Sequence, residues 1–526
     1  MRIRRKLAKF LTTATIALAA VPQLASAQTR PTDPSTLDIL DVLVEKGVLS
    51  RDDANSVLAE ARKRSEGDSV VRVPYVPDAI RNQIRDEVKR EVVATAKQEG
   101  WAQPGALPEW LDRFRFHGEM RMRGDAMGFG KNNTPLILDI NRINEDGAYF
   151  TDDVLPLVTT TEDRYRMRVR ARFGVDSRLT DHVEAGVRFV TGNLVEGVDA
   201  NQTLTGNFGR FVVGMDRAYI RVSPFDRGTR FGGTNVVVGK FANPFFSSEL
   251  LFDQDLQFEG VAGTVNVAFG DGEGAPSAFL TGGLFPMEEW DFTKHDKYML
   301  AGQIGLAGSP VAGVRLRAAA AYYDFNNTQG QYNTQGLRDN DFTAPGRVRF
   351  GNSVFNFRRD GGVVNTVKFG LASEFKVGAV TASGEFDVTP TLVATVDVEA
   401  LKNVGFKRQD LVDRQVPASS GDTAWYARLG IGHPDIGQAG AWNFNASYRR
   451  LEADSTLDLF TDTDFGLGGT DQKGFLVQGS WGVAKNLWLT GSWYSARTID
   501  LRDPRTGAVA PPIDTDTFMI DLNARF

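Results

Sequence analysis

Arginine recurs at alternating positions in two short segments of this chain. They carry Arg113, Arg115, Arg121 and Arg123, and then Arg164, Arg166, Arg168, Arg170 and Arg172. Residues two apart lie on the same face of a β-strand, so each segment predicts a strand with one basic face. Guanidinium groups at this density repel one another unless water, anions or carboxylates face them. We therefore expect a basic, water-facing wall built from these nine side chains.

Four carboxylates are the candidates to face this wall. They are Glu249, Asp253, Asp255 and Glu259. They come after a predicted strand at 234–242, on the third long connection, and we expect them at the narrowest point of a water-filled pore. Opposed basic and acidic surfaces would orient polar solutes there. The alternative is that the arginines pair with strand carboxylates such as Glu119 and Glu184.

The connection that carries these carboxylates begins near Asn243 and Pro244. Proline has no N–H for a ladder hydrogen bond, so the strand must end or bend there. We expect the connection to fold inward, packed by Phe245 and Phe246; an ordinary external loop is the alternative.

Metal and catalytic sites have weak support in the sequence. Asp462, Asp464 and Asp471 could bind calcium, but the glycine and glutamate of a calcium loop are missing, so a solvated external loop is favoured. The four histidines are scattered without metal-ligand spacing. Only His117 lies in a predicted strand, and no nucleophile accompanies it. We expect no metal ion, no cofactor and no enzymatic activity.

The arginine segments belong to a long series of two-residue alternations. In residues 164–175, for example, Tyr165, Met167 and Val169 alternate with the arginines. One apolar and one polar face predict lipid outside and water inside a transmembrane barrel. We predict sixteen antiparallel strands, at 113–126, 163–175, 183–194, 211–222, 234–242, 256–269, 277–286, 298–307, 312–324, 364–375, 391–402, 422–432, 440–452, 473–483, 486–498 and 516–526. The stretch 376–390 fits this scheme poorly and could hide a register error or another hairpin.

The connections between these strands support the barrel. Connections after even-numbered strands are mostly short, and those after odd-numbered strands are mostly long. Outer-membrane barrels have short periplasmic turns and long external loops. A barrel of about sixteen strands would enclose an aqueous lumen.

Three regions are expected along the chain. Residues 1–27 have the basic start, apolar stretch and small-residue end of a signal peptide. Residues 28–107 predict a short helical segment in the periplasm, with helices near 35–66 and 78–99 that form a coiled coil or lean on the barrel. Residues 108–526 form the barrel. No segment after residue 27 has about 18 uninterrupted apolar residues, so only a closed barrel could span a membrane.

The last predicted strand places Phe518, Ile520, Leu522, Ala524 and Phe526 on one face. An alternating strand that ends on an aromatic residue resembles the signal by which outer-membrane barrels are recognised for insertion. We therefore expect Phe526 to engage the barrel-assembly machinery. The net charge of −6 and the pI near 5.5 argue against a nucleic-acid partner.

Three groups of residues resemble the putative porin family of Gram-negative outer membranes. They are 239–245 with 252–260, 108–111 with 118–123, and 460–465 with 473–474. Phe252 stands where that pattern leads us to expect tryptophan. The resemblance spans nearly the whole mature chain. It implies a barrel in the outer membrane, a channel role and a helical periplasmic prefix, and general porins suggest a homotrimer.

The expected function is therefore passive diffusion of small hydrophilic solutes and ions through a water-filled channel. A substrate-selective uptake channel is an alternative, and the basic wall would then favour anions. A second alternative is a structural tether through the N-terminal helices. The sequence alone does not identify the solute.

Overall fold

The computed structural model describes residues 113–135, 137–146, 156–192, 197–226, 228–270, 272, 274–290, 294–359, 366–416, 419–502 and 508–526, together with Asp52 and Ser56. The chain divides into two units, residues 1–109 and 110–526. Asp52 and Ser56 are helical. The predicted signal peptide and the rest of the predicted helical segment lie outside the described residues.

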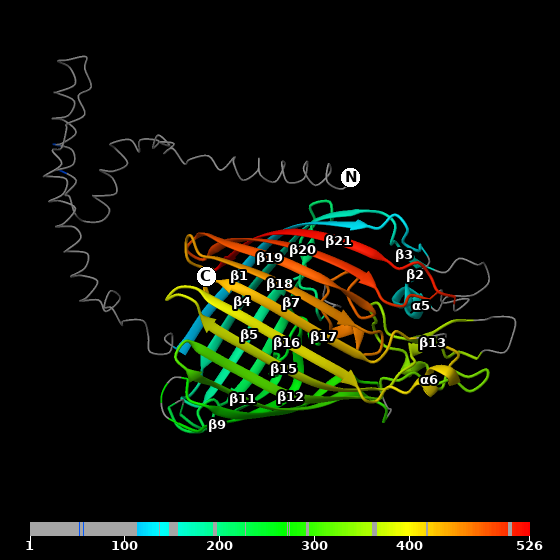
Figure 1. Ribbon diagram of the computed structural model, residues 1–526, viewed down its shortest axis with the longest axis horizontal. Coiled ribbons are helices and arrows are strands. Elements are labelled where there is room, and N and C mark those ends of the chain that lie inside the picture. The colour runs from blue at the N-terminus through cyan, green and yellow to red at the C-terminus, as the bar shows by residue number, and fades with distance from the viewer. Residues whose placement is uncertain are drawn as a thin grey trace, which may run out of the picture. The chain divides into compact units, whose positions relative to one another are not determined.

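The second unit is a closed barrel of sixteen antiparallel strands. A short additional strand, β6 (Gln202–Thr203), pairs with β4 of this barrel. Each strand pairs with the next along the chain (Figure 1). The strands are β1 (Phe114–Phe129), β4 (Arg164–Arg178), β5 (Val183–Thr191), β7 (Val213–Val222), β8 (Asn235–Ala242), β9 (Gln257–Ala268), β10 (Ser277–Glu288), β11 (Lys297–Val311), β12 (Val314–Asn326), β15 (Phe375–Asp387), β16 (Val393–Asn403), β17 (Thr423–Gly432), β18 (Trp442–Leu451), β19 (Gln472–Ala484), β20 (Leu487–Thr498) and β21 (Asp514–Arg525).

The barrel closes where the first strand meets the last. Strand β1 pairs with β4 on one side and with β21 on the other, where Met122 lies opposite Leu522. Closure satisfies every edge and removes the unpaired backbone groups that lipid cannot accommodate. The prediction of about sixteen strands is confirmed.

One predicted strand is wrong. We expected a strand at 364–375, whereas the barrel strand is β15, at Phe375–Asp387. The predicted segment holds only β14 (Phe369–Leu371), which pairs with β13 (Val354–Asn356) within a long connection. Strand β15 has small residues on both faces, with Ala379, Thr381 and Ser383 on one and Gly378, Ala382 and Gly384 on the other, so its hydrophobic contrast is weak.

The long connections follow every second strand of the barrel, counted from β1, as those after β1, β12 and β18 show. They carry the short elements, which gather at one end of the barrel in Figure 1. These elements also include β2 (Ile137–Leu138), β3 (Leu157–Val158), α5 (Ile140–Asp146), α6 (Arg408–Asp413), η2 (Asp341–Thr343) and η3 (Asp458–Phe460). Within the described ranges, no helix is long and apolar enough to cross a membrane. By the rule for outer-membrane barrels, this end is the external one.

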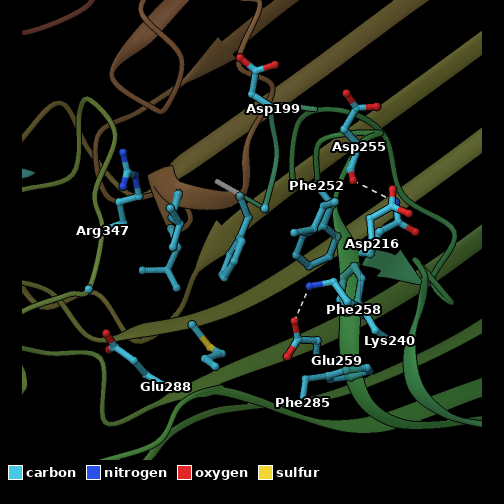
Figure 2. A pocket seen from close by; sticks show the side chains of 18 of the residues that line it. Asp199, Asp216, Lys240, Phe252, Asp255, Phe258, Glu259, Phe285, Glu288 and Arg347 are labelled. Atoms are coloured by element: carbon cyan, nitrogen blue, oxygen red, sulfur yellow. Dashed lines mark hydrogen bonds and ion pairs between the residues drawn. The ribbon is translucent and has the colours of Figure 1, made fainter. Parts of the chain in front are cut away.

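The two faces of the barrel wall differ in chemistry. The outward side chains are apolar and exposed, as Met120, Met167, Ile304 and Leu429 show. The inward face of β1 and β4 is polar, as predicted, but the inward face of β8 to β15 is largely apolar. Phe241, Phe258, Phe285 and Tyr323 are buried there, and Figure 2 shows Phe258 and Phe285 beside Phe252. The predicted polar lining therefore holds for only part of the wall, because the other part is covered by an inward-folded connection.

Candidate functional site

The arginines of β1 and β4 form a ladder across two neighbouring strands. Arg121 lies opposite Arg170, and Arg123 lies opposite Arg168, so like charges face each other directly. The residues between them, such as Met122 and Met167, are exposed on the outside of the barrel. Opposed like charges on a sheet are destabilising, so this arrangement requires carboxylates nearby.

Strand carboxylates supply part of the compensation. Asp125, which is fully buried, lies 3.0 Å from Arg166 and 2.7 Å from Arg168. Glu119 lies 2.9 Å from Arg170 and 3.1 Å from Arg172. The two Arg123–Asp521 hydrogen bonds, of 2.7 and 2.8 Å, join the first barrel strand to the last. Glu184 takes no part, because it pairs with Arg221. The alternative that strand carboxylates pair with the arginines is thus correct for Glu119 and not for Glu184.

Residues 243–256, which we call the first inward connection, fold into the barrel as predicted. Asn243 Oδ1 accepts a 2.9 Å hydrogen bond from the Phe245 N–H and so turns the chain at the proline. The Phe245 ring packs edge-on against Tyr323, with 5.3 Å between ring centroids. Gln303 of β11 exchanges two 2.9 Å hydrogen bonds with the Phe246 backbone. Leu250 and Leu251 are fully buried, so apolar packing fixes this connection to the wall.

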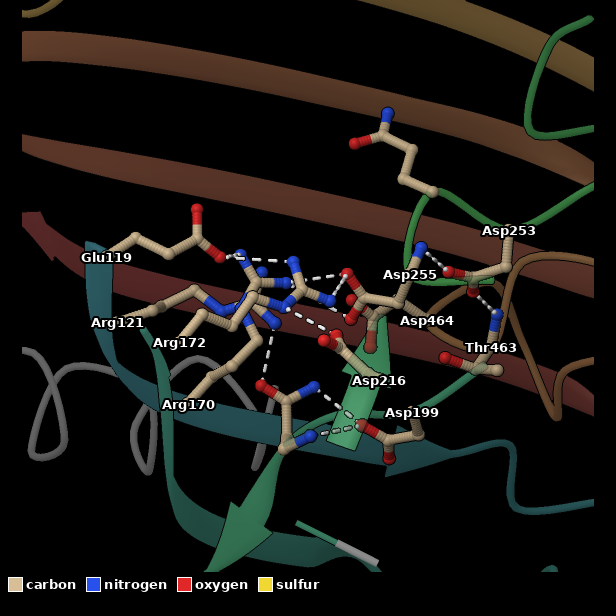
Figure 3. A network of polar contacts seen from close by, with 12 residues as sticks. Glu119, Arg121, Arg170, Arg172, Asp199, Asp216, Asp253, Asp255, Thr463 and Asp464 are labelled. Carbon is tan, nitrogen blue, oxygen red and sulfur yellow. Dashed lines mark hydrogen bonds and ion pairs between the residues drawn. The ribbon is translucent and has the colours of Figure 1, made fainter. Parts of the chain in front are cut away.

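The carboxylates of this connection meet the arginines directly. Asp255 lies 2.7 Å from Arg170 and 3.0 Å from Arg172, and Figure 3 shows these groups in one network with Glu119. Burial works to raise the pKa of Asp255, but Arg170 and Arg172 hold it at about 2. The acidic and basic surfaces therefore touch at this point, where we had expected them to face each other across the pore.

Residues 452–471, the second inward connection, also fold into the barrel. Asp454, Asp458 and Asp462 are buried there. Asp464 pairs with Arg123 and lies 3.3 Å from Arg168. The prediction of a solvated external loop is wrong, because these carboxylates compensate lumen arginines. In the described part of the chain, no cluster of three potential metal ligands occurs.

The two inward connections are joined to each other. The Asp253 N–H donates to the Phe460 carbonyl at 2.7 Å, and the Thr463 N–H donates to Asp253 Oδ2 at 3.1 Å. Arg449 of β18 lies beside both, 2.8 Å from Asp462 and 3.3 Å from Glu249. Burial, together with the charge of Asp462, raises the pKa of both Asp253 and Glu249. Burial likewise raises the pKa of Asp462.

The remaining predicted site residues lie outside this centre. Arg113 and Arg164 are exposed near the starts of β1 and β4, and Arg115 pairs with Asp176 at 2.8 Å. The placement of Glu259 on the connection is wrong, because Glu259 lies on β9 and pairs with Lys240 of β8. Glu259 is therefore not opposed to the arginine ladder.

Sequence reasoning did not identify several residues of the centre. Arg188 of β5 and Asp216 of β7 form two hydrogen bonds, of 2.9 and 2.7 Å. Their strand alternation could have revealed that both point inward. Arg449 and its pairing with Asp462 could have been recognised only with the second inward connection in place, since local periodicity carries no information about where a long loop folds.

A polar cavity of about 430 Å³ lies between the ladder and the inward connections. Its lining includes five arginines and seven carboxylates, which are Arg121, Arg123, Arg170, Arg172 and Arg428, and Glu119, Glu249, Asp253, Asp255, Asp462, Asp464 and Asp521. Within the described part of the barrel, Arg121 has an amide rather than a carboxylate as its close partner, Asn201 Oδ1 at 2.6 Å. The polar cavity is thus lined by groups of both charges rather than by arginines alone.

Comparison with known proteins gives the following matches. A family model described as "Putative porin" matches residues 33–526. No curated protein sequence matches the chain. Among solved structures, OprB of Pseudomonas putida is 13% identical, with 80% of this chain and 96% of that chain covered and a TM-score of 0.43. The outer-membrane channel DcaP of Acinetobacter baumannii is 9% identical, with coverage of 78% and 97% and a TM-score of 0.38. OmpF of Salmonella typhi, in complex with daunomycin, is 9% identical, with coverage of 78% and 97% and a TM-score of 0.39.

Proposed function

This chain belongs to the putative porin family, an outer-membrane family of diffusion channels, and from this premise we propose that its solutes pass between the arginine ladder and the two inward connections. The polar cavity that these elements line carries the proposal. A closed barrel keeps lipid out, and the charged lining keeps the passage hydrated.

The charges of this passage argue against strong ion preference. Five arginines and seven carboxylates line the cavity, and the closest groups are paired with one another. Burial raises the pKa of Glu249, Asp253 and Asp462, which lowers the negative charge that they contribute. The anion-preferring uptake channel expected from a bare basic wall is therefore not favoured, and we propose a weakly selective channel for small hydrophilic solutes.

Planar-bilayer recording tests this function. We expect ohmic single-channel currents and, in a tenfold KCl gradient, a reversal potential well below the ~59 mV of a perfectly selective pore. Absence of current from correctly folded protein would overturn the channel function. A reversal potential near the ideal value would overturn the proposal of weak selectivity.

We propose no catalytic role for the chain. His117 lies 3.6 Å from Asp176, which is the geometry of a general base with its orienting carboxylate. However, Asp176 already accepts hydrogen bonds from Arg115 at 2.8 Å and from Tyr219 at 3.0 Å. Because Asp176 already accepts these two hydrogen bonds, the contact between His117 and Asp176 supports a structural role.

Three further proposals concern the membrane placement, the oligomeric state and the insertion of the protein. We propose that residues 28–107 lie in the periplasm, that the protein forms a homotrimer, and that Phe526 engages the barrel-assembly machinery. The Phe526 backbone forms two 3.0 Å hydrogen bonds with Gly118 at the barrel seam, while its side chain is exposed. An exposed aromatic side chain at the seam supports the last of these proposals.

A further inference from the structure

A second cavity, of about 500 Å³, is lined by Phe252 and Leu256 of the first inward connection, whereas Glu249 and Asp253 of that connection line the polar cavity. Strands β5 and β7 to β11, residues 197–200, both inward connections and the connection 327–374 contribute to it. Asp255 lines this cavity and the polar cavity alike. Thr191, Glu288 and Lys297, which lie where their strands meet the long connections, line this cavity, so it lies toward the external end of the barrel.

The lining of this cavity is largely aromatic and aliphatic. Phe252, Phe258, Phe285 and Phe460 take part, and Figure 2 shows the first three along one side. Their rings pack edge to face, with 5.0 Å between Phe252 and Phe258 and 5.2 Å between Phe258 and Phe285. An inserted aromatic ring would pack against this array in the edge-to-face geometry that aromatic pairs prefer.

The charged residues that line this cavity include more carboxylates than cationic side chains. Six carboxylates and three cationic side chains line it, which are Asp199, Asp216, Asp255, Glu259, Glu288 and Asp458, and Lys240, Lys297 and Arg347. Several of the carboxylates are closely paired, as Glu288 is with Lys297 and Asp216 is with Arg188.

Asp199 has a longer ion pair than Asp216, Asp255, Glu259 and Glu288 have. Its nearest guanidinium nitrogen, on Arg168, is 3.4 Å away, and its other oxygen accepts hydrogen bonds from Asn201. An ammonium group would therefore gain more at Asp199 than at the closely paired carboxylates.

We propose that this cavity, here called the vestibule site, binds small amphipathic solutes that combine an aromatic ring with an ammonium group. The site deepens the proposed channel function, on which it rests, by naming a solute class that dwells there before crossing. Its volume falls within the range of small-molecule sites, which are mostly apolar with a few polar groups that set orientation.

Single-channel block with three probes tests this proposal. Phenethylammonium, ethylammonium and phenylacetate are added in turn from the external side of a bilayer. We expect phenethylammonium to reduce the current at concentrations at least ~10-fold lower than the other two, a difference of about 1.4 kcal/mol. Equal blocking concentrations for the three probes would overturn the vestibule site while leaving the channel function intact.

Two tryptophan variants on one strand separate the site from general effects. Met287 lines the cavity from β10, whereas Leu284 of the same strand is exposed on the outside of the barrel. Met287→Trp should fill the cavity and raise the blocking concentration of phenethylammonium to that of ethylammonium, while Leu284→Trp should not. Block unchanged by Met287→Trp would overturn the proposal.

A second substitution, which adds no volume, keeps the proposal testable if the tryptophan variant does not fold. Asp199→Asn should weaken phenethylammonium block several-fold and leave phenylacetate unaffected. If the wild-type protein carries no current, the channel function fails, and saturation-transfer NMR in detergent micelles decides the site separately. Signal transfer to phenethylammonium that Met287→Trp abolishes would support it, and absence of transfer would overturn it.

Discussion

Arg449 Nη1 donates a 2.8 Å hydrogen bond to Asp462 Oδ2, which joins barrel strand β18 to the second inward connection. The arginine is 2% exposed, and its guanidinium lies 4.6 Å from the centre of the Phe465 ring. Because Glu249 of the first inward connection lies on the same guanidinium, this one cation holds both connections in place.

Replacement of Arg449 should loosen both inward connections. Arg449→Leu would remove the cation that pairs with both Asp462 and Glu249, and loss of one partner from a buried pair costs about 3–5 kcal/mol. We expect larger open-channel current noise and faster proteolysis within 243–256 and 452–471. Arg450→Leu is the matched control, because Arg450 pairs only with the nearby Glu452, at 3.2 Å, and is more exposed. Equal noise in the two variants would contradict the role given to Arg449.

Asp255→Asn should shift ion selectivity toward anions. The substitution keeps the size of the side chain but removes the charge that neutralises Arg170 and Arg172. A unit charge at about 4 Å contributes roughly 1 kcal/mol even in bulk water, so the cation-to-anion permeability ratio should fall roughly fivefold. Reversal potentials in a KCl gradient measure the change.

Asp435→Asn controls for this change, because Asp435 lies on the short turn between β17 and β18, where it pairs with Arg525 at 2.7 Å, outside both cavities. Its reversal potential should match that of the wild type. Since the pKa of Asp255 is held at about 2, the contribution of Asp255 should not vary between pH 4 and pH 8. A selectivity change across that range that disappears in Asp255→Asn would contradict this assignment.

The barrel could be predicted from the sequence because lipid and water impose a two-residue period on every strand. The one failure, β15, has small residues such as Ala379 and Ala382 on opposite faces, so the period has little amplitude there. The arginine ladder was predicted for the same reason, since alternation alone places Arg168 and Arg170 on one face.

The contacts that complete the site could not be predicted in this way. Asp464 reaches Arg123 from a connection 341 residues away in sequence, and nothing local in residues 452–471 shows that they turn inward. The inward turn of 243–256 was different, because Pro244 marks the end of the strand. Phe245 and Leu250 then supply an apolar surface that must be buried.

The stability of the second inward connection should fall as pH rises from about 4 to about 6. Burial of Asp458 raises its pKa to about 6 from 3.8. The folded state therefore retains a proton that the unfolded segment has lost in this window, so the stabilisation is complete below about pH 4 and is lost as pH rises through 6. A shift of about two pKa units corresponds to about 3 kcal/mol at most.

Hydrogen exchange of the amides of residues 454–461 measures this effect. Protection in the wild type should decrease from pH 4 to pH 6.5 after correction for intrinsic exchange rates. In Asp458→Asn the amide stays neutral at every pH, so the decrease should be smaller. A wild-type profile that is flat after correction, or one that rises with pH, would show that Asp458 does not titrate in this way.

Depth in the membrane should set the cost of a charge on the outside of β11. Ile304 lies at the middle of this strand and Val311 at its end, beside the short turn to β12, and both are exposed. An arginine on the lipid face costs about 2–4 kcal/mol at the bilayer midplane and about 0–1 kcal/mol near the interface. Ile304→Arg should therefore destabilise the barrel much more than Val311→Arg, as measured by denaturant unfolding in lipid vesicles. Equal destabilisation by the two variants would mean that the outer face of β11 does not contact the hydrocarbon core, and the wall would then not span a membrane as described.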